Sequence, residues 1–348
     1  MKAKLRLAIF LATSLLPNVL KKFVYRAFFG AKIGADVRIG FGSVLCFEEM
    51  VIDSGCRIGW FNFVRVHDLR FGKRCRVGSF TKISCHAIDL GSASTIGSRV
   101  DILADHRDPR ARFTAGSESW IFEYCYINPA RPITLGRNVG VGGGSYLFSH
   151  GYWLSRLDGY PVSYGPIDIG DDVWLPWGCF IMPGVSIGSG AVVGARSLVT
   201  KSLPAGALAA GSPAKVVREN VAVMPTLEQK NEILLTTTKE FAEFTGRTLV
   251  VEETAEWFVC ALDGEPLMTL ARSEAPATYP RAGASALCLV HQPYSAVAES
   301  HPRAYSLRSY QCCAFDDIGP VQKEWLRHLR QIGVRHYPID EVNVEAAK

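Results

Sequence analysis

A chain of 348 residues with 48% hydrophobic residues is long enough for two globular domains, and this composition excludes a disordered protein. The formal net charge of +5 is small for this length, and the basic residues are scattered except near the start and around 201–218, so we expect no nucleic-acid partner. The ten cysteines follow no zinc-ribbon spacing, and Cys56, Cys75 and Cys179 fall on small inward positions of a repeat. They indicate reduced thiols in a cytoplasmic protein.

Residues 1–30 place basic side chains around an apolar run from Leu7 to Leu16, which Pro17 ends. The run is too short to span a bilayer and no small-residue cleavage site follows it, so we expect one or two helices. Two interpretations of this segment remain open. It is either an amphipathic foot on the cytoplasmic face of the membrane, or a helix that caps the end of the next domain.

Residues 31–222 carry an aliphatic residue at every sixth position, and this period predicts a parallel β-helix of about eight triangular coils. It is clearest in IGDDVWLPWGCFIMPGVSIGSGAVVGARSLVT, residues 169–200, where the fifth place of each block is small. The first four coils repeat every 19 residues. Their inward columns are Ile33, Ile52, Phe71 and Leu90; Ile39, Ile58, Val77 and Ile96; and Leu45, Val64, Ile83 and Ile102.

The same register predicts a polar column on one edge, formed by Glu48, His67, His86 and Asp105. Stacked imidazoles between carboxylates could hold a metal ion. Such a column is more often a solvated polar edge, and we expect no metal.

The repeat is interrupted twice before it ends. Residues 107–132 are irregular, although Ile121 and Ile127 keep the pattern of one coil, and residues 149–166 form a loop, SHGYWLSRLDGYPVSYGP. Loops inside rigid repeats commonly carry function. Residues 223–348 follow as a separate α+β domain, with helices expected at 226–246 and 317–332 and strands between them.

The segment 123–219 resembles the hexapeptide-repeat acyltransferases, in particular the galactoside, maltose, nodulation-factor and colanic-acid O-acetyltransferases. The matching stretches are ITLGRNVGVGGGSYLFSHG and, after the loop, PIDIGDDVWLPWGCFIMPGVSIGSGAVVGARSLVTKSLPAGALAAGSPAKVVRE. The resemblance implies a left-handed β-helix and a homotrimer with active sites between subunits. It also implies acetyl-CoA as the acyl donor.

The resemblance places His150 at the position of the general base, and an imidazole with a pKa of about 6.5 suits proton removal near neutral pH. Glu123, in the segment WIFEYCYIN, is the candidate partner that orients it. Trp177 stands where the family has a small residue, so it either narrows the acyl slot, which favours acetyl, or turns outward toward the acceptor. The expected donor contacts are Trp174, Trp177, Ala195, Thr200, Lys201, Lys215 and Arg218, with the last three on the nucleotide phosphates.

The aromatic loop around His150 predicts a saccharide acceptor, because sugar C–H faces stack on such rings. We therefore expect an O-acetyltransferase that modifies a sugar of a surface polysaccharide or of its lipid-linked precursor, which the C-terminal domain would help to present. Three alternatives remain open: N-acylation of an amino-sugar nucleotide, a γ-carbonic-anhydrase-like metal site at His67 and His86, and a non-catalytic trimeric scaffold. The expected acceptor contacts are Tyr146, Tyr152, Trp153, Arg156, Tyr160 and Tyr164.

Overall fold

The computed structural model describes residues 3–151, 154–223, 225–273, 287–290, 304–306, 311–312, 319–331 and 337–338. Tyr152 and Trp153, two of the expected acceptor contacts, lie outside these residues. The chain forms two compact units, residues 1–223 and 224–348, and each is described by itself.

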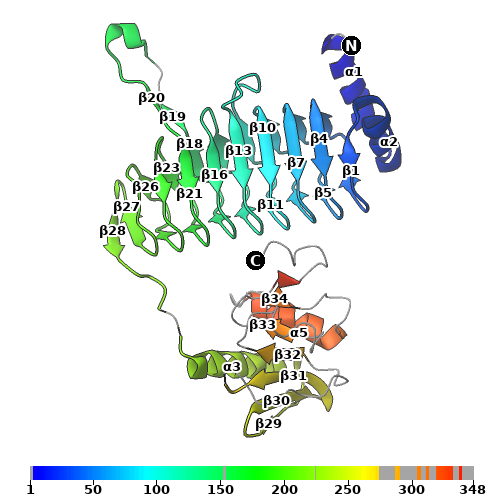
Figure 1. Cartoon of the computed structure of the whole chain (residues 1–348), viewed down its shortest axis with the longest axis vertical. Coiled ribbons are helices and arrows are strands. Elements are labelled where there is room, and N and C mark those ends of the chain that lie inside the picture. Colours follow the sequence, from blue (N-terminus) through cyan, green and yellow to red (C-terminus); the bar gives the residue numbers. More distant parts are fainter. Residues whose placement is uncertain are drawn as a thin grey trace. The chain divides into compact units, whose positions relative to one another are not determined.

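The first unit is a three-sided parallel β-helix (Figure 1), in which successive strands of each face come from successive coils. Among the described residues, faces A and C hold eight strands each. Face A consists of β1 (Lys32–Ile33), β4 (Glu49–Ile52), β7 (Asp68–Phe71), β10 (Ala87–Leu90), β13 (Arg112–Ala115), β16 (Ile133–Leu135), β21 (Ile167–Ile169) and β24 (Ser186–Ile187). Face C consists of β3 (Val44–Cys46), β6 (Phe63–Arg65), β9 (Lys82–Ser84), β12 (Asp101–Leu103), β15 (Tyr126–Asn128), β18 (Tyr146–Phe148), β23 (Phe180–Ile181) and β26 (Leu198–Val199).

Face B is the longest of the three sheets because a hairpin extends it after the last coil. Its final strand is antiparallel to its neighbour and ends the parallel stacking. Face B consists of β2 (Arg38–Ile39), β5 (Arg57–Ile58), β8 (Arg76–Val77), β11 (Thr95–Ile96), β14 (Trp120–Ile121), β17 (Gly140–Val141), β22 (Trp174–Leu175), β25 (Val192–Val193), β27 (Leu208–Gly211) and β28 (Ala214–Arg218).

The predicted register of the first four coils is confirmed by the strand pairing. Ile33 pairs with Ile52, Ile39 with Ile58 and Leu45 with Val64, and each column continues through the next two coils. The aliphatic side chains of these columns are buried and form one continuous core. Each such side chain contributes about 1.5–3 kcal/mol by leaving water, so the repeat itself supplies the main stabilising term.

The small inward cysteines lie as the repeat predicted. The thiol of Cys56 donates to the carbonyl of Gly72 at 3.0 Å, and that of Cys75 donates to the carbonyl of Gly91 at 3.1 Å, so each thiol reaches the next coil. Burial raises the pKa of Cys179 to about 11. The eight cysteines whose side chains the structure describes are buried and free of disulfides.

The predicted polar column is wrong at its last member. Glu48, His67 and His86 are in register, because the amide of Glu48 donates to the carbonyl of His67 and that of His67 donates to His86. The next place is Ala111 rather than Asp105, since the amide of His86 donates to the carbonyl of Ala111 at 2.7 Å. This coil is longer than the earlier ones, and its insertion carries Asp105 out of the column. Ile121 and Ile127 keep the predicted coil complete.

Two helices close the first coil, α1 (Ala3–Ser14) and α2 (Asn18–Phe29). Phe10 and Tyr25 are buried against Phe47, with Phe10 only 3% exposed. Among the described residues, no helix is both long enough and apolar enough to cross a membrane. The outer side of the two helices exposes Leu5, Leu7, Leu11, Leu15, Val19, Leu20, Phe23 and Phe28.

An antiparallel hairpin replaces the corner between faces C and A after β18 (Figure 1). It is built from β19 (His150–Gly151), the 3-10 helix η1 (Arg156–Asp158) and β20 (Ser163–Tyr164). In Figure 1 the hairpin projects away from the β-helix, so its tip extends beyond the stacked coils.

The second unit is an α+β fold around a mixed sheet. Helix α3 (Leu227–Thr245) begins with a capping box between Thr226 and Gln229, and α5 (Pro320–Gln331) buries Trp325. The sheet order follows the chain: β29 (Leu249–Glu253), β30 (Trp257–Leu262), β31 (Glu265–Ala271), β32 (Leu287–Val290), β33 (Ala304–Ser306), β34 (Gln311–Cys312) and β35 (Tyr337–Pro338). Within the described residues the helices α3 and α5 and the strands β29 to β34 lie where they were predicted, whereas β35, which follows the second helix, was not predicted.

Candidate active site

His150 lies at the base of the hairpin, on the edge between faces C and A. It pairs with Tyr164 across the two short strands, and the two rings stack with centroids 6.1 Å apart. Buried Ser149 anchors the strand to the coil below, because its hydroxyl donates to the carbonyl of Asn128 at 2.8 Å. The imidazole is therefore half-buried at a fixed place where the hairpin leaves the β-helix.

The electrostatic surroundings favour a neutral His150. Burial lowers the pKa of this imidazole, and the positive charge of Arg131 lowers it further. Both effects disfavour the protonated ring. A neutral imidazole can accept a proton, which is the state that a general base requires.

Arg131 is a residue of this site that the sequence did not indicate. Its guanidinium carbon lies 4.2 Å from the ring centroid of Tyr164, and its backbone amide donates to the hydroxyl of Ser149 at 2.8 Å. A guanidinium nitrogen also lies 3.8 Å from a carboxylate oxygen of Asp108. The usable signal was the stacking register, which places the corner after Asn128 directly below Ser149.

Glu123, the expected partner of His150, lies on a different edge of the prism. It follows β14 at the corner between faces B and C, where its carbonyl accepts from the amide of Gly144. From Gly144 to His150 the coil runs across face C, which is roughly 20 Å of extended chain. Within one chain, face C therefore separates the Glu123 carboxylate from the imidazole.

The expected donor contacts lie in three places: the edge between faces C and A, the edge between faces B and C, and face B itself. Thr200 and Lys201 follow β26 at the corner between faces C and A, on the edge that carries His150. Trp177 and Ala195 lie on the edge between faces B and C, and Trp174 lies on face B. Lys215 and Arg218 are exposed on β28, at the end of face B.

Trp177 faces outward, as one of the two interpretations of this residue expected. Its side chain is 54% exposed and covers Gly143, where an added Cβ would meet the indole at 1.8 Å. Trp174 covers Gly140 in the same way, and Phe122 contacts both indoles, with ring centroids 6.1 and 5.9 Å apart. The glycines of the VGVGGGS segment thus make room for two flat-lying indoles.

Of the expected acceptor contacts that the structure describes, only Tyr164 contacts the imidazole ring. Tyr146 lies on face C, where it stacks on Phe180 with centroids 5.2 Å apart. Arg156 and Tyr160 lie in the outer part of the hairpin and are exposed.

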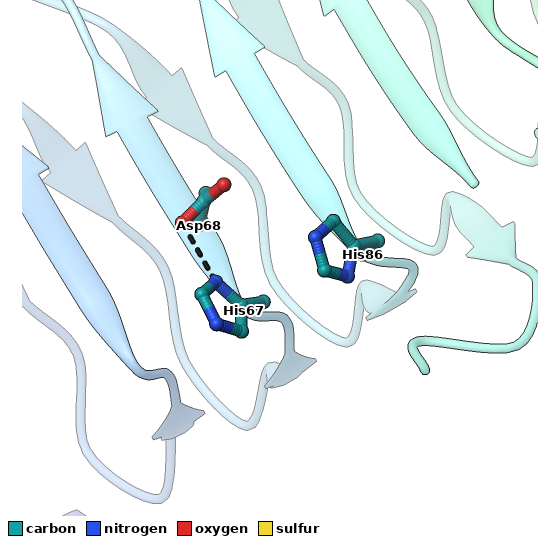
Figure 2. A group of neighbouring side chains, drawn as sticks. All are labelled: His67, Asp68 and His86. Atoms are coloured by element: carbon teal, nitrogen blue, oxygen red, sulfur yellow. Dashed lines mark hydrogen bonds and ion pairs between the residues drawn. The ribbon is translucent and has the colours of Figure 1, made fainter. Parts of the chain in front are cut away.

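The side chains of His67, Asp68 and His86 form a cluster (Figure 2). It lies at the edge between faces C and A, the edge that carries His150 several coils later. The two rings stack with centroids 4.9 Å apart, and Nδ1 of His67 is 2.8 Å from a carboxylate oxygen of Asp68. One ligand atom from each side chain lies within 4.8 Å of the others, so the group could hold a divalent cation after small ring rotations. Glu48 does not join it, because it forms an ion pair with Arg6.

Part of the chain is similar to curated acetyltransferases. It is 38% identical over 112 residues to the provisionally named colanic acid biosynthesis acetyltransferase of Escherichia coli K12, which covers 32% of this chain and 60% of that protein. It is 33% identical over 129 residues to the galactoside O-acetyltransferase of the same organism. That match covers 30% of this chain and 63% of the relative. The predicted resemblance to these acetyltransferases is confirmed. The chain spans about 60% of the length of these acetyltransferase relatives.

Solved structures that resemble the chain include acetyltransferases. A polySia-specific acetyltransferase matches 62% of this chain and 94% of its own with a TM-score of 0.39 and 20% identity. A hexapeptide-repeat acetyltransferase of Vibrio cholerae was solved with acetyl-CoA. Its match covers 62% of this chain and 85% of that one, with a TM-score of 0.28 and 20% identity. No family model matches the chain.

Proposed function

We propose that this protein is an acetyl-CoA-dependent O-acetyltransferase that modifies a sugar hydroxyl of a surface polysaccharide or its precursor. The observation that carries the proposal is the half-buried imidazole of His150, whose pKa is lowered at the mouth of a hairpin. It lies in the segment 123–219, whose sequence resembles the hexapeptide-repeat acyltransferases, and the chain is similar in part to known acetyltransferases. The exposed Lys201, Lys215 and Arg218 fit the phosphates of the donor.

In the proposed reaction, His150 takes the proton of the acceptor hydroxyl as its oxygen attacks the thioester carbonyl. A backbone amide in the segment 174–177 stabilises the oxyanion of the tetrahedral intermediate. The carbon–sulfur bond then breaks, the acetyl group stays on the sugar oxygen, and the imidazolium returns its proton to the leaving thiolate. Tyr164 and Arg131 position the ring and keep it neutral before each cycle.

We further propose that the active form is a homotrimer. The expected donor contacts divide between the edge of His150 and the region of Trp174 and Trp177, which face C separates within one chain. A neighbouring copy that placed its face B against the edge of His150 would unite the two groups. Glu123, on the second edge, would then approach the imidazole of another subunit.

Transfer to an amino group is the second candidate. The chain is 39% identical over 96 residues to a tetrahydropyridine-dicarboxylate N-acetyltransferase of Staphylococcus aureus, which matches 28% of this chain and 37% of that protein. Mild alkali separates the two products, because it cleaves an ester and leaves an amide intact.

The decisive experiment incubates the full chain with acetyl-CoA and a panel of oligosaccharides and follows the release of free thiol. Mass analysis before and after alkali then identifies the bond formed. We expect acceptor-dependent thiol release and an alkali-labile acetyl group. An alkali-stable acetyl group would replace the proposal with N-acylation, and thiol release that no acceptor increases would contradict both.

A further inference from the structure

Three arginines lie one above another at the start of face B. Arg38, Arg57 and Arg76 hold the outward positions of β2, β5 and β8, and the strand pairing places them in direct register. Neighbouring strands are about 4.8 Å apart, so the guanidinium groups repeat at roughly that interval. In the part of the chain that the structure describes, none of the three forms an ion pair.

Such a row carries an electrostatic cost. Two like charges about 5 Å apart repel by about 1 kcal/mol even in water, and by more beside a protein surface. On face A the outward Arg70 instead pairs with an acidic residue, Asp89, on the next strand. Burial raises the pKa of Asp89, and the positive charge of Arg70 lowers it. An anion bound along face B would remove the repulsion that the row of arginines creates.

The arginines line an open groove of about 410 Å³. Its floor is a column of glycines, and an added Cβ at Gly59 would lie 2.5 Å from the carbonyl oxygen of Gly78. Trp60 and Trp120, which are 62% and 49% exposed, also line the groove. A basic row, a floor without side chains and exposed indoles thus share one surface.

The edge beside this groove exposes aromatic rings at a cost in backbone energy. Gly42, Gly144 and Gly178 occupy one corner position in three coils, whereas Phe61, Phe80 and Tyr124 occupy it in others, with φ of 54°, 60° and 62°. Left-handed backbone costs a residue with a side chain roughly 1–2 kcal/mol. Phe61 and Phe80 are 47% and 52% exposed and stack on each other at 5.6 Å, so core burial does not explain them. Positive φ recurs at corners along the whole β-helix, so the exposed rings, rather than the backbone, distinguish this edge.

We infer that the groove on face B binds an acidic saccharide chain. Carboxylate or phosphate groups of the saccharide contact Arg38, Arg57 and Arg76, and the pyranose faces stack on Trp60 and Trp120. The repeat of an extended chain of pyranose rings is of the same order as the spacing of the arginines. The inference rests on the proposed function and narrows its acceptor to anionic glycans, because face B continues from Trp120 to Trp174.

The test measures binding by calorimetry, with the full chain, of an oligogalacturonate and of an uncharged malto-oligosaccharide of equal length. We expect the wild type to prefer oligogalacturonate, with an affinity that falls as salt rises. The combined change Arg38→Ser, Arg57→Ser and Arg76→Ser should lower that affinity at least tenfold and flatten its salt dependence. Arg70→Ser, on face A, is the matched control and should bind as the wild type does.

A second variant keeps the arginines and changes the aromatic edge. Phe61→Gly with Phe80→Gly should leave the melting temperature nearly unchanged, because glycine adopts positive φ without strain. The affinity for oligogalacturonate should nevertheless fall severalfold. If neither variant alters binding, or if the wild type binds both oligosaccharides equally, the inference is wrong. Stronger binding to duplex DNA or to anionic lipid vesicles than to oligogalacturonate would also overturn it.

Turnover separates this inference from the function on which it rests. A wild type that acetylates neutral sugars but does not bind oligogalacturonate refutes the acidic acceptor alone. A wild type that binds oligogalacturonate but releases no thiol from acetyl-CoA with any acceptor refutes the acyltransferase proposal and leaves the binding groove.

Discussion

Arg131 and Tyr164 form a cation–π pair behind the imidazole of His150. The guanidinium carbon lies 4.2 Å from the Tyr164 centroid, and the opposite strand position is His150. Because this positive charge disfavours imidazolium, Arg131→Ala should raise the pKa of His150. A general base is inactive when protonated, so a base with a higher pKa loses activity at a higher pH as the solution is acidified. The acidic limb of the pH–rate profile should therefore move to higher pH.

The control for this change is Arg137→Ala. Arg137 forms an ion pair with Asp172 at 3.0 Å and is no cause of the His150 shift. The control should leave the acidic limb in place. An acidic limb that moves equally in both variants, or downward with Arg131→Ala, would show that Arg131 does not set this pKa.

Removal of the base gives the most direct prediction. His150→Ala should lower kcat by roughly 10²–10⁴, the usual contribution of a positioned general base. His106→Ala removes another half-buried imidazole, in the insertion before β13, and should retain activity. Thiol release measures turnover and circular dichroism verifies the fold. Wild-type turnover by a folded His150→Ala protein would show that His150 is not the general base.

A site shared between subunits predicts complementation. His150→Ala and Trp174→Ala homotrimers should both be impaired, because each lacks one side of every site. Mixed and refolded at equal amounts, they should regain about a quarter of the wild-type sites, since each site draws its two residues from different chains. Mixtures no more active than the separate variants would place the whole site in one chain.

The helices at the start of the chain should stabilise the first unit. Phe10 is 3% exposed and stacks on Phe29 at 4.4 Å. Phe10→Ala should therefore cost about 3–5 kcal/mol, or roughly 6–20 °C in melting temperature for a unit of this size. Leu11→Ala, whose side chain is 48% exposed, should change the melting temperature little. Equal melting temperatures for the two variants would contradict a structural role of α1.

The outer side of the same helices tests separately whether residues 1–30 form an amphipathic membrane foot, the other interpretation of this segment. Phe23 and Phe28 are 61% and 70% exposed, so Phe23→Ser with Phe28→Ser should not destabilise the fold. The change should reduce flotation with vesicles that contain anionic lipid, because both rings would enter the interface. If the wild type does not float with such vesicles, the helices act only as a cap.

The sequence predicted the structure best at the inward positions of the repeat, where each residue stacks on the equivalent residue of the next coil. The interval between Ile33 and Ile52 predicted their pairing, because the prism interior accepts an aliphatic residue at that place in every coil. Asp105 was misplaced because a corner can lengthen without disturbing the strands on either side, so the interval does not constrain it. Arg131 was missed for a related reason: its role depends on the hairpin that begins in the next coil, and the irregular sequence of residues 107–132 obscured the register that places its corner below Ser149.

The first coil also bears on how this protein limits its own length. A parallel β-helix ends in open backbone groups that can pair with another coil. Here α1 and α2 occupy them: Asn18 bonds both the carbonyl of Val37 and the amide of Ile39, Lys21 donates to the carbonyl of Gly40, and the amide of Gly42 donates to Ser14. Without these contacts the open backbone groups of the first coil would be free to pair with another copy, and pairing repeated from copy to copy would build a filament instead of a discrete molecule.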